Sequence, residues 1–244
     1  MIDRSWASRF RLPPPGNVME RHERREEVFV AQGTRIANAL LALVERHAGK
    51  PAGACRILDF GCGCGRVALP LYHVLGKPDA CVDVDPAVID YLAREIPGAN
   101  PLLTRFDPPL PFADDAFDVV LAVAVWTRLD PEYSDLWLTE LRRILRPGGL
   151  ALVTTGNYAM LANRRKDPAL GALGWKDVGD ERLRREGFVF IQTAPTPGTG
   201  PYGTAVHDPG YVLSVWSAYM PVIDIVPGGM EGVQDINVLR KPDA

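Results

Sequence analysis

The chain has 244 residues, 47% of them hydrophobic and 23% charged, which is enough to bury a full core as one α/β domain. Its formal net charge of −3 creates no field that attracts a polyanion, which disfavours DNA or RNA as the partner. No run approaches the roughly 20 apolar residues of a membrane-spanning helix, and no apolar signal-peptide region follows the N-terminus, so we expect a cytoplasmic protein.

The first segment of the chain, residues 1–50, is expected to be an arm followed by a helix. The arm is polar and ends in Pro13–Gly16, a sequence that cannot be helical. From Met19 to His47 apolar residues recur at helical spacing opposite a charged face. We expect Gly33 to break or bend this helix.

After Lys50 the pattern changes to short apolar runs separated by helical stretches. Such alternation predicts a parallel sheet with helices on its faces. The last of these helices is expected between Asp130, an N-cap followed by Pro131, and the stop at Pro147–Gly149. The expected strands are Arg56–Phe60, Ala80–Val84, Pro101–Arg105, Asp118–Val125 and Leu150–Thr155.

The C-terminal third of the chain has a different pattern, with glycine- and proline-rich connections. Strands are expected at Gly187–Thr193, Val222–Val226 and Asp235–Leu239, and one helical stretch near Pro209–Met220. The last two of these strands, Val222–Leu239, are typical of an antiparallel hairpin.

The four cysteines, at positions 55, 62, 64 and 81, all fall within one predicted strand–turn–strand unit. A disulfide framework would cross-link nothing there, so we expect reduced thiols. Cys55, Cys62 and Cys64 could supply thiolates to a metal, but no second Cys or His pair stands at zinc-site spacing. We therefore predict no metal site.

A glycine-rich turn follows the first expected strand, in the sequence Asp59-Phe60-Gly61-Cys62-Gly63-Cys64-Gly65. At the carboxyl edge of an open α/β sheet, glycines let the backbone approach a ligand closely. Taken alone, such a turn is also compatible with a purely structural role. Asp83, at the end of the second strand, can accept hydrogen bonds from both hydroxyls of a ribose. Its alternative role would be to cap the next helix, but Asp85 followed by Pro86 already fills that role.

The spacing of this turn excludes two classes of cofactor. A dinucleotide fingerprint requires its third glycine at position 66, where this chain has Arg66. The phosphate-binding loop of nucleoside triphosphatases, which ends in Gly-Lys-Ser/Thr, is absent as well. A cofactor without phosphate groups fits the turn better.

These residues resemble the class I S-adenosylmethionine-dependent methyltransferases, over about Arg56 to Thr155 and more loosely to the C-terminus. The resemblance rests on four motifs in the order typical of the family. They are Ile57–Gly65, Val82–Pro86, Leu110–Phe112 followed by Ala116–Val120, and Leu141–Leu150. The resemblance implies a Rossmann-like α/β fold: a mostly parallel seven-stranded sheet, helices on both faces and an antiparallel C-terminal hairpin.

The resemblance also implies the domain organisation and a cofactor site. Residues 1–50 would cover that site, residues 51–244 would form a single methyltransferase domain, and residues 156–220 would elaborate the acceptor site. Asp83 would hold the ribose, Val84 and Phe106 the adenine, and Val125 the methionine end. Asp107 would accept from the adenine amine, although it is equally compatible with a turn before Pro108. The full predicted set is Asp59, Gly61, Cys62, Gly63, Gly65, Asp83, Val84, Phe106, Asp107 and Val125.

The predicted chemistry needs few catalytic groups, because the methyl of a sulfonium is already a strong electrophile and the enzyme mainly aligns the acceptor and excludes water. The four histidines are at positions 22, 47, 73 and 207, and His207 is the candidate general base. It lies in Gly203–Tyr211, a segment expected to be a loop after the fifth strand. The alternative is that His207 is an ordinary loop residue beside Asp208, which caps the next helix. Relatives often carry Thr-His-Leu where this chain has Thr127-Arg128-Leu129.

The acceptor site is predicted from residues near the methionine end and in the tail. Arg128 could bind a carboxylate or phosphate, or be exposed to solvent. By the same resemblance Trp126 would face the methionine end of the cofactor. Aromatic surface for a sugar or aromatic acceptor, or packing in the core, would come from Tyr202, Tyr211, Trp216 and Tyr219. The leading hypothesis is therefore a methyltransferase acting on a small molecule or glycan. The alternatives are an S-adenosylmethionine-binding partner protein without catalysis and another nucleoside-using transferase of the same fold.

Overall fold

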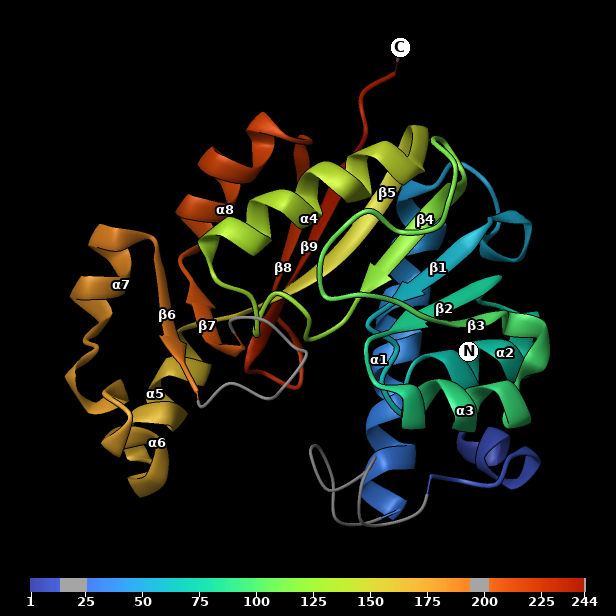
Figure 1. The fold of residues 1–244 in the computed structure, drawn as a ribbon, viewed down its shortest axis with the longest axis horizontal. Helices are drawn as coiled ribbons and strands as arrows, with labels where there is room; N and C mark the ends of the chain where they lie inside the picture. Colours follow the sequence, from blue (N-terminus) through green and yellow to red (C-terminus); the bar gives the residue numbers. More distant parts are fainter. Residues whose placement is uncertain (14–25, 194–201, 244) are drawn as a thin grey trace.

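The computed structural model describes residues 1–13, 26–193 and 202–243 (Figure 1). Pro14, Pro15, Gly16 and His22, and the expected start of the first helix at Met19, lie outside the described residues. The strands are β1 (Ile57–Phe60), β2 (Ala80–Asp83), β3 (Pro101–Leu103), β4 (Phe117–Ala122), β5 (Leu145–Gly156), β6 (Phe188–Gln192), β7 (Gly203–His207), β8 (Val222–Met230) and β9 (Gln234–Arg240). The α-helices are α1 (Glu26–His47), α2 (Ala68–Leu75), α3 (Pro86–Glu95), α4 (Pro131–Ile144), α5 (Tyr158–Lys166), α6 (Pro168–Ala172), α7 (Asp180–Glu186) and α8 (Pro209–Val215).

The main sheet has seven strands in the order β3-β2-β1-β4-β5-β9-β8. The first five strands of this order pair in parallel, and β9 pairs antiparallel with both β5 and β8. The expected fold class is confirmed: the sheet is mostly parallel and ends in an antiparallel C-terminal hairpin. Because the chain reverses direction across the sheet between β1 and β4, a crevice is expected at their carboxyl ends.

Alternate residues of the central strands belong to two apolar cores, one on each face of the sheet. Ile57 and Val119 face a core shared with α1, α2 and α3. Leu58 and Val120 face a second core shared with α4 and α8. This period of two is what strands buried on both faces require, and it explains their continuous apolar sequences.

The predicted helix caps are confirmed where the structure describes them. Asp85 Oδ1 accepts a hydrogen bond from Ala87 N at 2.9 Å, and Asp130 Oδ1 accepts one from Tyr133 N at 2.9 Å. Both caps satisfy amides that have no partner within the helix. The helix after Asp130 ends at Ile144, before the predicted stop, because β5 already begins at Leu145 and includes Pro147–Gly149.

The expectation that Gly33 interrupts the first helix is wrong. α1 runs through Gly33, and a Cβ atom placed there would lie 2.6 Å from Arg66 O and 3.2 Å from Trp6 Cζ2. Glycine is thus required by close packing between α1 and the segment after β1. α1 also has the length and composition of a membrane span, with a mean hydropathy of 1.2 over 18 residues, and half of that window is buried in the fold.

The expectation of a single helical stretch in the tail is also wrong. α5, α6 and α7 precede α8, and Gly203–His207, expected as a loop, is strand β7, which pairs antiparallel with β6 in a second, two-stranded sheet. These elements surround a third apolar core that includes Leu161 and Trp175, and they form a lobe beside the main sheet (Figure 1). The three helices have only five to nine residues and little apolar periodicity, so their sequences carry a weak signal.

Candidate functional site

A cavity of about 380 Å³ lies where the carboxyl ends of the parallel strands meet. Its wall is formed by the segments that follow four neighbouring strands: 59–64 after β1, 82–86 after β2, 104–106 after β3 and 123–125 after β4. This is the size and position of a small-molecule site in an open α/β sheet.

The glycine turn after β1 is folded back onto β2, because Gly61 N and Cys62 N both donate to Val82 O, at 2.9 and 3.1 Å. Gly61 has φ +70°, and a Cβ atom there would lie 2.4 Å from Val125 Cγ2. Gly63 has φ +51°, and a Cβ atom there would meet nothing within 4 Å. The bare backbone of Gly63 therefore borders open space in the cavity wall.

Gly65, which was predicted with the cofactor-binding set, is not among the residues that line the cavity. A Cβ atom at Gly65 would lie 2.7 Å from Leu92 Cδ2 and 3.0 Å from Leu69 Cγ. In the structure this glycine permits close packing of α2 and α3 beneath the turn.

Asp83 is held in place by two backbone amides at the end of β2. Its Oδ2 accepts from Gly63 N at 2.9 Å, and its Oδ1 accepts from Asp85 N at 3.0 Å. Burial raises the pKa of Asp83, and the amide hydrogen bonds act against that shift. The carboxylate is thus preorganised in the cavity wall, with lone pairs left for hydroxyl donors.

Asp59 lies in the same wall with only 1% of its surface exposed. Burial, and then the nearby charge of Asp83, raise the pKa of Asp59 to about 7. Its Oδ2 is buried without a hydrogen-bond partner among the described residues. A buried carboxylate oxygen of this kind can receive a hydrogen bond or a positive charge from a ligand.

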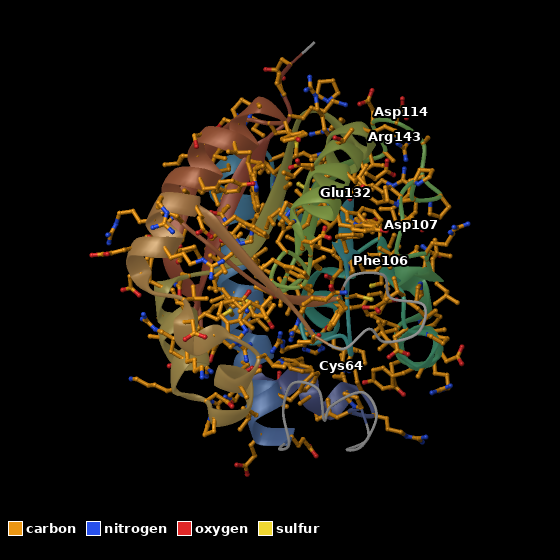
Figure 2. The ribbon with its side chains drawn as sticks, turned by 60° about the vertical axis from the view of Figure 1, so that its left-hand side comes forward. Cys64, Phe106, Asp107, Asp114, Glu132 and Arg143 are labelled. Carbon is orange, nitrogen blue, oxygen red and sulfur yellow. The ribbon has the colours of Figure 1, made fainter. Side chains whose placement is uncertain are left out.

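Phe106 and Asp107 lie next to each other on the connection that leaves β3 (Figure 2). Phe106 lines the cavity and packs edge-on against Tyr133, with ring centroids 4.6 Å apart. Asp107 does not line the cavity, and its Oδ1 accepts from Tyr133 Oη at 2.8 Å. Val84, which does line the cavity, has 38% of its surface exposed.

The segment after β4 is anchored by residues that the sequence did not indicate. Ala124 has φ +59°, a left-handed conformation that is uncommon for a residue with a side chain. Its amide donates to Thr154 Oγ1 at 2.7 Å, and Thr154 donates to Gln234 Oε1 at 2.7 Å. These contacts hold Val125 against Gly61, although no local pattern marks Ala124, Thr154 or Gln234.

The predicted acceptor residues divide into two groups. Arg128 and Tyr202 line the cavity, and the Arg128 guanidinium carbon lies 5.4 Å from the centre of the Tyr202 ring. Trp126 and Tyr211 do not line it. Trp126 is fully buried beneath the wall, where its Nε1 donates to Ser134 Oγ at 3.0 Å.

Strand β7 is joined directly to the segment after β4. Gly203 N donates to Arg128 O at 3.2 Å, and Ala205 N donates to Thr127 O at 2.9 Å. These two backbone hydrogen bonds bring the β6–β7 sheet to the edge of the cavity. The contact joins positions about 75 residues apart in sequence.

His207 lies at the end of β7, with 1% of its surface exposed, and is not among the residues that line the cavity. Its ring is surrounded by those of Phe188, Tyr211 and Trp216, with centroids 4.5 to 6.3 Å away. Both ring nitrogens lack hydrogen-bond partners among the described residues, and burial lowers the pKa of His207 to about 3. The imidazole is neutral at pH 7, as a base must be, and its catalytic role stays a prediction.

Other lining residues were not predicted from the sequence, among them Arg66, Thr104, Leu129 and Trp137. Trp137 could have been found as part of the apolar face of α4, and the others have no local signal. None of the described residues before Asp59 lines the cavity, so the expected covering role of residues 1–50 stays a prediction. In the described part of the chain no group of three or more His, Cys, Asp or Glu side chains could hold a metal ion, and all four cysteines are buried.

Comparisons with known proteins give the site a context. Residues 58–153 match the family model described as "Methyltransferase domain". An uncharacterized methyltransferase of Mycobacterium tuberculosis is 31% identical over 137 residues, which are 56% of this chain and 50% of that protein. The tRNA N(3)-cytidine methyltransferase METTL2 of Gallus gallus is 26% identical over 122 residues, 46% of this chain and 33% of that protein.

Among solved structures, the 1,6-didemethyltoxoflavin-N1-methyltransferase of Burkholderia thailandensis, crystallised with its substrate and S-adenosylhomocysteine, superposes with a TM-score of 0.56 at 15% identity. The match covers 96% of this chain and 94% of that one, and it shows a shared fold. The chain spans about half the length or less of the curated relatives it matches. Residues 58–153 therefore match a methyltransferase domain, and the chain shares the fold of a solved methyltransferase.

Proposed function

We propose that the protein transfers the methyl group of S-adenosylmethionine to an oxygen or nitrogen of a small-molecule or glycan acceptor. One observation carries the proposal: the Gly61–Gly63 turn, Asp83 and Val125 meet around a single cavity at the carboxyl edge of the sheet. These are the positions at which class I methyltransferases are expected to hold the cofactor.

The described residues fit this cofactor on chemical grounds. Asp83 would accept hydrogen bonds from the ribose hydroxyls, since two amides already fix its orientation. Gly63 leaves room for the cofactor beside the backbone. The unpartnered Oδ2 of Asp59 would receive the positively charged amino end of the methionine part. Phe106 and Val84 would pack on the adenine.

S-adenosylmethionine supplies an electrophilic methyl group, so the task of the protein is to align the acceptor and exclude water. Val125, Leu129 and Trp137 give the cavity an apolar wall that supports both. His207 remains the candidate base for an acceptor whose proton must be removed. To act directly, it would need the acceptor to reach its buried ring between Phe188 and Tyr211.

The acceptor class and the location of the protein are part of the proposal. The net charge of −3 supports an acceptor other than a nucleic acid, although METTL2, named as a tRNA methyltransferase, is among the relatives. A cytoplasmic location is supported by α1, whose apolar residues pack against the sheet and α2.

Calorimetry with S-adenosylmethionine and S-adenosylhomocysteine tests the cofactor, with NAD as a negative control. We expect both sulfur compounds to bind and NAD not to bind. Methyl transfer is then followed by mass spectrometry with pooled hydroxy and amino compounds, oligosaccharides and tRNA as acceptors. Failure of both sulfur compounds to bind would falsify the proposal, and methylation of tRNA alone would overturn the acceptor class.

The second candidate function is an S-adenosylmethionine-binding protein without catalysis. It is favoured by two observations: Arg128 occupies the position where relatives often carry histidine, and His207 does not line the cavity. Cofactor binding without methyl transfer to any pool would support this candidate.

A further inference from the structure

Two arginines stand at the junction of the cavity and the lobe formed by α5, α6, α7 and the β6–β7 sheet. Arg128, in the segment after β4, lines the cavity and stacks on Tyr202. Arg164 lies near the end of α5, which follows β5 at the same carboxyl edge of the sheet. Arg164 is not among the residues that line the cavity, but α5 packs against β7, whose Gly203 N donates to Arg128 O at 3.2 Å. Burial, and then the charge of Arg128, lower the pKa of Arg164.

Neither guanidinium forms an ion pair with a carboxylate in the described part of the chain. Among the described residues, the Arg128 side chain forms no hydrogen bond or ion pair, and its contact is the face of the Tyr202 ring. Arg164 is partly buried, and its Nε is fully enclosed without a hydrogen-bond partner. A buried donor without a partner is costly, and two like charges at one place add to the cost. An anion placed between them would relieve both costs.

The charged residues next to Arg164 in sequence have other hydrogen-bond partners. Asp167, the acid whose charge acts on Arg164, uses its Oδ1 to cap α6 by accepting from Ala169 N and Leu170 N. Arg165, the next residue of α5, donates to Asp180 Oδ1 at 2.7 Å. Arg164 is therefore set apart from its neighbour by its lack of a partner.

We propose that Arg128 and Arg164 together bind a carboxylate or phosphate group of the acceptor, so that the protein selects an anionic small molecule. The planar guanidinium groups suit either anion, because each offers paired N–H donors. Tyr202 would pack against the part of the acceptor next to the anion, since it stacks on Arg128 at the cavity wall. This assignment of the acceptor rests on the proposed function of the cavity.

The test measures binding of inorganic phosphate and of succinate by calorimetry, with the protein saturated with S-adenosylhomocysteine. We expect at least one anion to bind the unmodified protein, and the tighter one to identify the group. Arg128→Met and Arg164→Met should each weaken this binding about tenfold to a hundredfold, as the loss of a charged hydrogen bond predicts. Lys166→Met, which removes an exposed charge from the same helix, should leave it unchanged.

Thermal unfolding without anions distinguishes a role of Arg164 in anion binding from a role in the stability of the fold. Arg164→Met removes an unpartnered donor and a repulsion but keeps an apolar stem, so its melting temperature should equal or exceed that of the unmodified protein. A lower melting temperature, absence of binding by either anion, or equal loss of binding in Lys166→Met would overturn the proposal.

The carboxylate of the cofactor is the competing occupant, and a pair of probes tests it. If Arg128→Met and Arg164→Met weaken S-adenosylhomocysteine but not 5′-methylthioadenosine, which lacks the carboxylate, the site belongs to the cofactor and the proposal is wrong. If S-adenosylhomocysteine does not bind the unmodified protein at all, the proposed function fails. In that case, anion binding is measured on the protein without cofactor. Its loss in the two arginine variants would still show whether the arginine pair binds an anion.

Discussion

Polar side chains in the cofactor wall, which we define as residues 59–65 and 82–86, are held mainly by backbone amides. Asp83 is the clearest case, with amides of Gly63 and Asp85 on its two oxygens. In the acceptor side, defined as residues 156–193 and 202–220, several buried polar atoms have no partner. They belong to Arg164, Trp175, His207 and Trp216.

The two regions differ in how many of their buried polar atoms lack a hydrogen-bond partner among the described residues. In the cofactor wall, the buried side-chain atom without a hydrogen-bond partner among the described residues is Oδ2 of Asp59, a residue that lines the cavity. Asp83 is already held by hydrogen bonds before any ligand binds. In the acceptor side the unpartnered atoms come from four separate elements, and none of the four residues is among those that line the cavity. The predictions below test whether partnered and unpartnered groups respond to substitution in opposite ways.

The largest effect is expected where a buried charge would lose its partner. Glu140 is 5% exposed and accepts from Arg143 Nε at 2.9 Å and Nη2 at 2.7 Å. Arg143→Met would leave this carboxylate buried without a cationic partner, with Leu110 N as its remaining donor, which should lower the free energy of unfolding by about 3–5 kcal/mol in urea denaturation. Arg142→Met is the matched control, because Arg142 is exposed on the same helix. Equal losses in the two variants would contradict the role of the pair.

Asp83→Ala should weaken cofactor binding by about 1.5–3 kcal/mol, because charge-assisted hydrogen bonds to the ribose would be lost. Calorimetry with S-adenosylhomocysteine measures the effect, and Asp90→Ala, an exposed acid on α3, is the control. Asp83→Asn keeps an acceptor for the Gly63 amide, so a smaller loss in this variant separates ligand contact from collapse of the turn. Unchanged affinity in Asp83→Ala would refute the ribose assignment.

The sequence predicted most of the cofactor wall, because its signals are local. A strand, a glycine turn and an acid after the next strand lie within 27 residues, from Ile57 to Asp83, and each follows from backbone geometry. Gly65 shows the limit of that reasoning, since spacing alone does not distinguish a glycine at the ligand from one that packs on Leu92. The parallel pairing of the central strands followed from the local alternation of strands and helices.

The acceptor side could not be predicted in the same way, because long-range contacts determine it. Strand β7 is placed by hydrogen bonds to Thr127 and Arg128, and the left-handed Ala124 by Thr154 across the sheet. His207 was expected in a loop, yet pairing with Phe188 makes it the end of a buried strand. None of these partners can be identified from neighbouring residues in the sequence.

The buried His207 should make the stability of the protein depend on pH. The pKa of His207 falls from its ordinary value of 6.5 to about 3 on folding, because burial disfavours the charged ring. The stability contributed by the neutral ring is therefore complete above pH 6.5 and is lost as the pH falls towards 3. Between pH 8 and pH 5 the unmodified protein should lose about 2 kcal/mol more than His207→Phe, as measured by urea denaturation. Parallel pH profiles would contradict the burial of a neutral histidine.

The same variant tests the proposed base. With S-adenosylhomocysteine affinity unchanged, loss of a general base should slow methyl transfer about a hundredfold or more, whereas loss of packing alone should leave turnover of the folded protein as before. Turnover equal to that of the unmodified protein would remove His207 from the mechanism.

The last comparison concerns two glycines of the cofactor wall, Gly63 and Gly65, which both have positive φ but should respond differently to substitution. Each substitution by alanine places a side chain at a positive φ, which costs about 1–2 kcal/mol of stability. At Gly65 the new methyl also collides with Leu92 and Leu69, so Gly65→Ala should lower stability further and reduce cofactor affinity mainly through misfolding. At Gly63 the methyl enters open space beside the cavity, so Gly63→Ala should lose S-adenosylhomocysteine affinity while remaining the more stable variant. If Gly65→Ala were the more stable of the two and the poorer binder, the ligand would lie against Gly65, and the original assignment of all three glycines to the cofactor would be supported.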